Sequence, residues 1–109
     1  MVFEAINYIR ANLSATLKIE KVAESVFCSA ATLNRRFKSE TNSTVAKYIE
    51  WLCMLEAKRK LGVETDKSIG EISADLGYCD QFYFSRRFEK TFSITPRKYR
   101  KLLTETKLN

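Results

Sequence analysis

Residues 77–99 read GYCDQFYFSRRFEKTFSITPRKY, a stretch that contains a turn, an amphipathic helix, a second turn and the start of another helix. Asp80 stands where an N-cap belongs, because its carboxylate can accept from the backbone N–H groups of the following turn. Phe84 and Phe88 are four residues apart, so the helix predicted over 81–91 turns an aromatic stripe toward a core. Pro96 lacks an N–H and has a helix-compatible φ, which predicts that a last helix starts there.

The opposite stripe of the same predicted helix is polar and carries Gln81, Ser85, Arg86 and Glu89. Its side chains are short or hydrogen-bonding, and they surround a central arginine. Such a face is suited to contact base edges in DNA, since arginine pairs with guanine and glutamine with adenine.

The positive charge of the chain is concentrated in this region. The chain has 109 residues, a formal net charge of +6 and a pI near 9.3. Residues 77–101 carry seven Lys and Arg against Asp80 and Glu89, an excess of five that accounts for most of the net charge. A basic balance of this kind favours a polyanionic partner, either nucleic acid or an anionic membrane surface.

Composition excludes several classes of protein. Three glycines and one proline leave little room for the turns of an all-β fold. No apolar run approaches 18 residues and no signal peptide is recognisable, so the chain is expected to be soluble, cytoplasmic and without a membrane partner. There is no histidine, and the three cysteines form no CxxC pair, which excludes the usual zinc sites. We therefore expect no metal, no cofactor and no enzymatic activity.

Helical periodicity recurs along the whole chain and predicts an all-α fold. The segment 44–61 is apolar on more than one side, as a helix between two modules would be, and Gly62 is its expected C′ residue with positive φ. Ser29 and Ser68 are expected N-caps. The predicted helices cover residues 2–13, 19–26, 30–40, 44–61, 69–76, 81–91 and a last segment from 96 onward.

A repeat relates the two halves of the chain. Residues 19–26 match 69–76 at an offset of 50, and Leu33-Asn-Arg-Arg-Phe37 matches Phe84-Ser-Arg-Arg-Phe88 at an offset of 51. The chain therefore contains one helix-turn-helix unit twice, in which the second helix of each unit would enter the major groove. The duplication and the charge excess favour DNA readout over an ordinary solvated face. Candidate phosphate contacts are Lys38, Lys90, Arg97 and Lys98.

These motifs resemble the DNA-binding domain of the AraC/XylS family of bacterial transcription regulators. The similarity runs from about Val2 to Leu103. It is carried by KVAESV (21–26) and SAATLNRRFK (29–38) in the first unit, and by IGEISADLGY (69–78), YFSRRF (83–88) and TPRKYR (95–100) in the second.

The resemblance implies one AraC-type domain over 1–109, with a first subdomain at 2–43, a linker helix at 44–61 and a second subdomain at 68–103. It implies a seven-helix monomer that places two recognition helices in neighbouring major grooves of double-stranded DNA. Contact with RNA polymerase is also implied, and any dimerisation is expected through a missing N-terminal domain. Base contacts carry over by position to Ala31, Thr32, Asn34, Arg35, Gln81, Phe82, Ser85 and Arg86.

Several residues depart from the family pattern. Phe27 stands where the first turn tends to have glycine, so this turn must either keep φ negative or absorb strain. Asn42 and Ser93 replace the glycine that commonly follows each recognition helix, and Cys53 replaces a basic residue of the linker helix. We therefore expect the first module to contribute less to sequence readout than the second. A helical protein-interaction module that exposes Trp51 is the rival interpretation.

Overall fold

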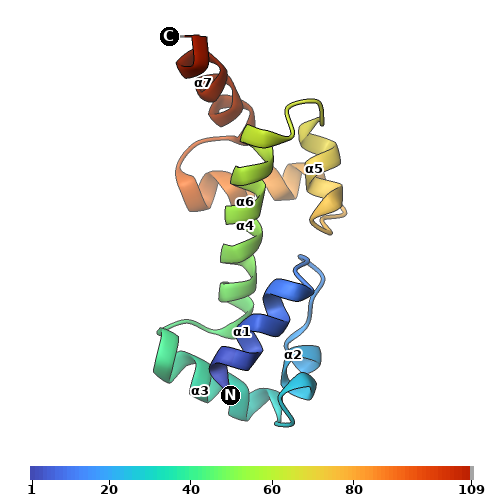
Figure 1. Ribbon diagram of the computed structural model, residues 1–109, viewed down its shortest axis with the longest axis vertical. Coiled ribbons are helices and arrows are strands. Elements are labelled where there is room, and N and C mark those ends of the chain that lie inside the picture. Colours follow the sequence, from blue (N-terminus) through green and yellow to red (C-terminus); the bar gives the residue numbers. More distant parts are fainter. Residues whose placement is uncertain (109) are drawn as a thin grey trace. The chain divides into compact units, whose positions relative to one another are not determined.

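The computed structural model describes the backbone of residues 1–108 and the side chains of residues 1–105. The regular structure of the described residues consists of seven helices joined by short loops, which confirms the predicted all-α fold with two helix-turn-helix subdomains joined by a long helix. The helices are α1 (Val2–Ala11), α2 (Ile19–Ser25), α3 (Ala30–Thr41), α4 (Val45–Val63), α5 (Ile69–Asp75), α6 (Gln81–Phe92) and α7 (Pro96–Leu108) (Figure 1).

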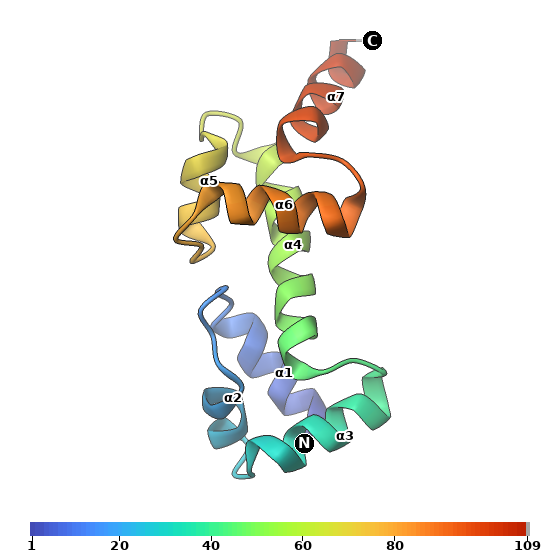
Figure 2. The same ribbon diagram turned by 180° about the vertical axis from the view of Figure 1, so that it is seen from behind.

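The chain divides into two compact units, Met1–Cys53 and Met54–Asn109, so α4 contributes residues to both. In the first unit α1, α2 and α3 pack on one another, and a short turn joins α2 to α3 (Figure 2). Helix α3 buries Leu33 and Phe37 completely. The ring of Phe37 meets that of Tyr48 from α4 edge-on, with 5.1 Å between centroids.

The second unit has a continuous core formed by three helices. Met54, Ala57 and Leu61 of α4 pack against Ile72 and Leu76 of α5 and against Phe84 and Phe88 of α6. Figure 2 shows α6 crossing the C-terminal half of α4, with α5 beside it. The inward aromatic stripe predicted for α6 is therefore the centre of this core.

The predicted caps are present at the helix starts. Ser29 Oγ accepts from the Thr32 N–H at 3.1 Å, and Asp80 Oδ1 accepts from the Phe82 N–H at 2.8 Å. Ser68 forms a complete capping box with Glu71, since each side chain accepts from the other residue's backbone N–H. Thr95 Oγ1 accepts from the Lys98 N–H at 3.1 Å, which caps α7.

Helix α4 extends further than predicted. It continues through Gly62 to Val63, and Gly62 does not have positive φ, so the expectation that Gly62 ends this helix is wrong. A Cβ on Gly62 would lie 3.3 Å from Leu103 Cδ1, so the glycine allows α7 to approach α4 closely.

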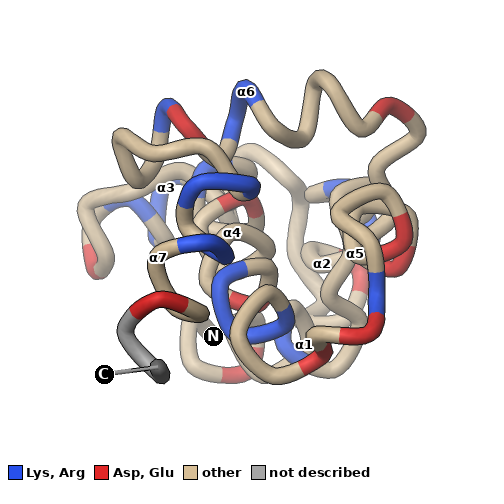
Figure 3. The backbone as a smooth tube through the Cα atoms, turned by 90° about the horizontal axis from the view of Figure 1, so that it is seen from above, with Lys and Arg blue, Asp and Glu red and all other residues tan. Residues whose placement is uncertain are grey.

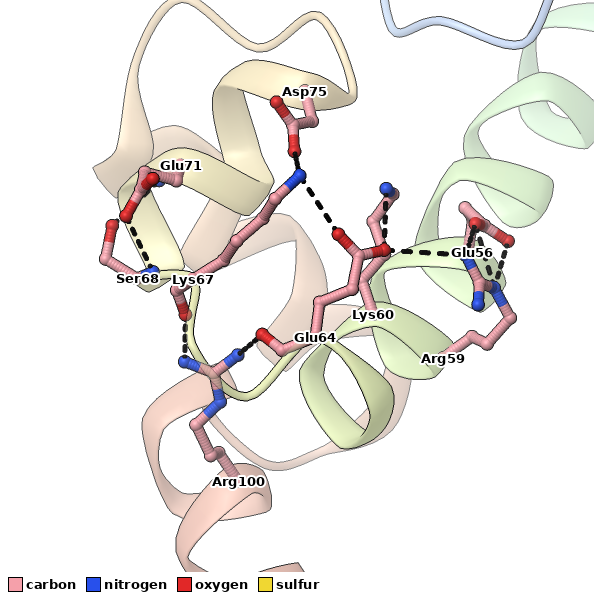
Figure 4. A network of polar contacts seen from close by, with 9 residues as sticks. All are labelled: Glu56, Arg59, Lys60, Glu64, Lys67, Ser68, Glu71, Asp75 and Arg100. Carbon is pink, nitrogen blue, oxygen red and sulfur yellow. Dashed lines mark hydrogen bonds and ion pairs between the residues drawn. The ribbon is translucent and has the colours of Figure 1, made fainter.

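Arg100 fixes the C-terminal end of α4. Its guanidinium donates to three backbone carbonyls, those of Leu61 (3.2 Å), Glu64 (3.2 Å) and Lys67 (2.6 Å). Figure 4 shows the bonds to Glu64 and Lys67. Carbonyls at the end of a helix have no partners within the helix, so one side chain of α7 satisfies groups that α4 leaves open. Arg100 therefore ties α7 to the end of α4 and to the loop before α5.

Ion pairs reinforce the same junction. Glu64 contacts Lys60 and Lys67 at 3.0 Å each, and Lys67 also contacts Asp75 of α5 at 2.6 Å (Figure 4). Hydrogen bonds from Lys60 and Lys67 hold the pKa of Glu64 below its usual value. Because these side chains are partly exposed, each pair adds little stability alone. Together they orient the loop that leads into α5.

Asn34 makes a contact that the helical pattern does not predict. Its Oδ1 accepts from the N–H of Val45, the first residue of α4, at 3.0 Å. Val45 is completely buried and Asn34 is half-buried. The carbonyl oxygen of Asn34 therefore caps α4 from within α3.

Among residues 1–108, three residues other than glycine have left-handed backbone conformations. Asn42 (φ 63°) and Ser93 (φ 61°) end α3 and α6, and Phe27 (φ 57°) lies in the first turn where Gly77 (φ 90°) lies in the second. Phe27 therefore absorbs the strain, since this backbone conformation is unfavourable for a residue with a side chain. Its ring is 97% exposed, so burial of the ring does not offset this strain.

Within the described residues, no helix has the length and apolar character needed to cross a membrane. No group of three or more Cys, Asp or Glu side chains in that part of the chain is arranged to hold a metal ion.

Phe27→Gly should raise the free energy of unfolding by about 1 kcal/mol, because glycine adopts positive φ without the steric cost. Urea denaturation followed by circular dichroism measures the effect. Phe27→Ala is the matched control, since it removes the same exposed ring but keeps the Cβ. Equal stability of the glycine and alanine variants would show that the turn is not strained.

Asn34→Ala should lower the free energy of unfolding by about 1–2 kcal/mol, because it leaves the buried Val45 N–H without an acceptor. Asn34→Asp keeps an acceptor oxygen and should retain most of the stability. Arg35→Ala, at an exposed neighbouring position of the same helix, serves as the control and should change stability by less than about 0.5 kcal/mol. A loss for Arg35→Ala as large as that for Asn34→Ala would contradict this assignment.

Candidate nucleic-acid interface

The outward face of α6 is set by the side chains that the helix buries. Phe84 and Phe88 are completely buried, and residues on the opposite side of the helix therefore face solvent. Gln81, Phe82 and Arg86 are exposed, while Ser85 is half-buried. These four are the positions predicted to contact bases, and the structure brings them together along the N-terminal half of one helix.

The aromatic residues Phe82 and Tyr83 differ in their surroundings. Phe82 is 73% exposed, so its ring is accessible to a partner. Tyr83 is less exposed, and its ring lies against that of Tyr78 with 6.3 Å between centroids. Of the two, Phe82 is the more exposed aromatic side chain of α6.

The corresponding face of α3 is less open. Ala31 and Arg35 are exposed, but Thr32 and Asn34 are half-buried and engaged in contacts within the protein. Thr32 Oγ1 accepts from Ser29 Oγ at 2.9 Å, and Asn34 caps α4. Two of the four positions predicted to contact bases in α3 are therefore held by internal hydrogen bonds.

Basic side chains fall into two groups. Figure 3 marks Lys and Arg positions on α3 and on α6, and the predicted phosphate contacts Lys38, Lys90, Arg97 and Lys98 are all exposed. The second group is engaged within the protein, and sequence reasoning did not separate it from the first. It comprises Arg59, Lys60, Lys67 and Arg100.

Lys58 also acts within the second unit. Its ammonium group lies 4.6 Å from the ring centre of Phe92 and 5.5 Å from that of Tyr99. This cation–π contact joins α4 to the end of α6 and the start of α7. The internal roles of Lys58 and Arg100 depend on residues far away in the chain, which is why their local sequence gave no signal.

The cysteines do not add to the candidate interface. Cys53 is completely buried, and burial, with a smaller effect from Glu50, raises the pKa of its thiol to about 11. Cys53 is therefore a neutral, buried residue of α4. Cys28 is half-buried and Cys79 is exposed, and both are free thiols.

Comparisons with known proteins agree with this arrangement. A family model described as a helix-turn-helix domain matches residues 22–102. The chain is 36% identical over 107 residues to the xylose operon regulatory protein of Escherichia coli K12, an alignment that covers 98% of this chain and 27% of the relative. The chain thus spans about a quarter of the length of that relative.

Solved structures show the same fold. A transcriptional regulator from Chromobacterium violaceum, described as containing an AraC-type DNA-binding domain, superposes with a TM-score of 0.86 at 30% identity and covers 94% of this chain and 90% of that one. The DNA-binding domain of AdpA, solved with a target DNA, superposes with a TM-score of 0.84 at 24% identity over 93% of this chain and 90% of that one, and it shows likeness of fold. From the matched family model and these relatives, the chain belongs to the AraC/XylS family of helix-turn-helix DNA-binding domains of bacterial transcription regulators.

Proposed function

We propose that the chain recognises a specific sequence in double-stranded DNA by placing α6 in one major groove and α3 in a neighbouring one. The observation that carries this proposal is the outward face of α6. Gln81, Phe82 and Arg86 are exposed at the start of a helix whose rotation is fixed by two buried phenylalanines. The major groove presents a distinct set of donors and acceptors for each base pair, so such a face can discriminate between sequences.

Each of these side chains has a base that it can contact. The Arg86 guanidinium donates two hydrogen bonds in the geometry that guanine accepts, and the Gln81 carboxamide matches adenine. Phe82 can cover the methyl group of thymine, and Ser85 can donate or accept. In α3, Arg35 is the proposed guanine contact and Ala31 an apolar neighbour.

We assign α6 the larger share of sequence readout. Thr32 and Asn34 have oxygens engaged in capping hydrogen bonds, so they act in the first unit as positioning residues for α3 and α4. The phosphate contacts proposed are Lys38, Lys90, Arg97 and Lys98, which would hold the protein on the duplex without reading sequence.

The similarity to operon regulators supports a role in bacterial transcription, in the cytoplasm where the chromosome lies. We propose that this chain acts without enzymatic activity, as a monomeric DNA-binding module. We propose RNA polymerase as a partner of the whole regulator, and membership of the family is the basis of that proposal.

Binding to duplex DNA should weaken steeply as salt increases, because each neutralised phosphate releases condensed counterions. With roughly six phosphates neutralised, log K against log salt should have a slope of about −5. Fluorescence anisotropy with a labelled duplex at several salt concentrations measures this slope. A slope flatter than about −2 would favour the rival protein-interaction module.

Arg86→Ala should weaken binding to a selected DNA site by about 1–3 kcal/mol and relax the preference at one base pair. Lys90→Ala should weaken binding to selected and random DNA by the same factor, since a phosphate contact is independent of sequence. Competition binding with both DNAs distinguishes the variants. Identical behaviour of the two variants would refute the division of α6 into a base face and a phosphate face.

A further inference from the structure

Gln81 of α6 lies directly over Gly70 of α5. A Cβ placed on Gly70 would lie 2.7 Å from Gln81 Oε1 and 3.6 Å from Gln81 Cδ. The distance to Oε1 is shorter than two non-bonded atoms tolerate. The carboxamide of Gln81 therefore occupies the space that a side chain at position 70 would need. The next atom near this space is Ser68 Oγ, at an ordinary 3.8 Å.

The fold itself does not require glycine at position 70. Gly70 lies inside α5, and its φ is not positive, unlike that of Gly77. Glycine within a helix is less favourable than alanine by about 1 kcal/mol. Among the side chains that the structure describes, Gln81 alone is close enough to exclude a Cβ there.

The internal repeat gives an independent comparison. At offsets of 50 and 51, Gly70 corresponds to Glu20 and Gln81 corresponds to Ala30. The first unit thus builds the same pair of helices with a full side chain at position 20 and with no long side chain at position 30. The glycine occurs in the unit whose recognition helix begins with a long hydrogen-bonding residue.

We propose that Gly70 is a specificity-determining residue that sets the resting position of the Gln81 carboxamide. The inference rests on the proposed role of Gln81 as a base contact. A free glutamine side chain has several rotamers and loses conformational entropy when it binds a base. The missing Cβ of Gly70 leaves room for the rotamer in which the Gln81 carboxamide lies over α5, whereas a methyl group at position 70 forces the carboxamide to move.

The test is Gly70→Ala, a substitution that the helix accepts. Stability should stay the same or increase, because alanine favours the helix and the atom it meets is at the end of a flexible side chain. In the unbound 109-residue chain, the side-chain amide NMR signals of Gln81, assigned by their loss in Gln81→Ala, should shift. Unchanged signals in Gly70→Ala would overturn the inference.

Selection from a library of randomised DNA duplexes then measures the base preferences of four proteins: wild type, Gly70→Ala, Gln81→Ala and the double variant. Gln81→Ala should remove the preference at one base pair. Gly70→Ala should reduce discrimination at that same pair by roughly tenfold, within the range of one bidentate contact. In the Gln81→Ala background, Gly70→Ala should change nothing further. Glu20→Ala, the matched change in the first unit, should leave all preferences intact.

The outcomes separate this inference from the proposed function. If Gln81→Ala leaves every preference unchanged, Gln81 does not read a base and both proposals for it fail. If Gln81→Ala removes a preference that Gly70→Ala retains, only the role of Gly70 is overturned. An effect of Gly70→Ala that persists without Gln81 would also overturn it, because the coupling would then run through another residue.

Discussion

The rotation of α6 about its own axis depends on two buried rings. Phe84 and Phe88 lie one helical turn apart, both completely buried against α4 and α5. Because successive residues of a helix differ in direction by about 100°, this anchoring decides which of two adjacent arginines faces solvent. Arg86 is exposed, whereas Arg87 is half-buried and makes contacts within the protein. A core interaction thus selects the residues that are available to DNA.

Features that depend on neighbours in the chain could be predicted from the sequence, whereas features that depend on distant residues could not. The caps at Ser68 and Asp80 were predictable, because a capping side chain and its N–H partner are two or three residues apart. Asn34 caps a helix that begins 11 residues later, and Arg100 reaches carbonyls 33 to 39 residues earlier. Gly62 had the local pattern of a helix end, but the approach of α7 accounts for it instead.

In the candidate site, too, only the features that depend on neighbouring residues were predictable. Helical periodicity predicted correctly that Arg35, Gln81 and Arg86 are exposed, since exposure follows from which side of the helix is buried. The orientation of a side chain on that exposed face depends on the element beside it. Gln81 rests on Gly70 because α5 approaches the start of α6, and only the folded structure brings these two residues together. The two recognition helices therefore share a sequence motif but differ in the helix surface on which their first side chain rests.

Arg100 shows how a mutational scan of this domain can mislead. It belongs to the basic segment TPRKYR, beside the exposed Arg97 and Lys98, and it holds the end of α4 and the loop that follows through three carbonyls. In a screen scored by loss of DNA binding, a substitution at Arg100 would resemble a substitution at a residue that contacts DNA. The suppressors would differ: a stabilising second-site change elsewhere in the core can rescue a folding defect, but it cannot restore a missing contact with DNA.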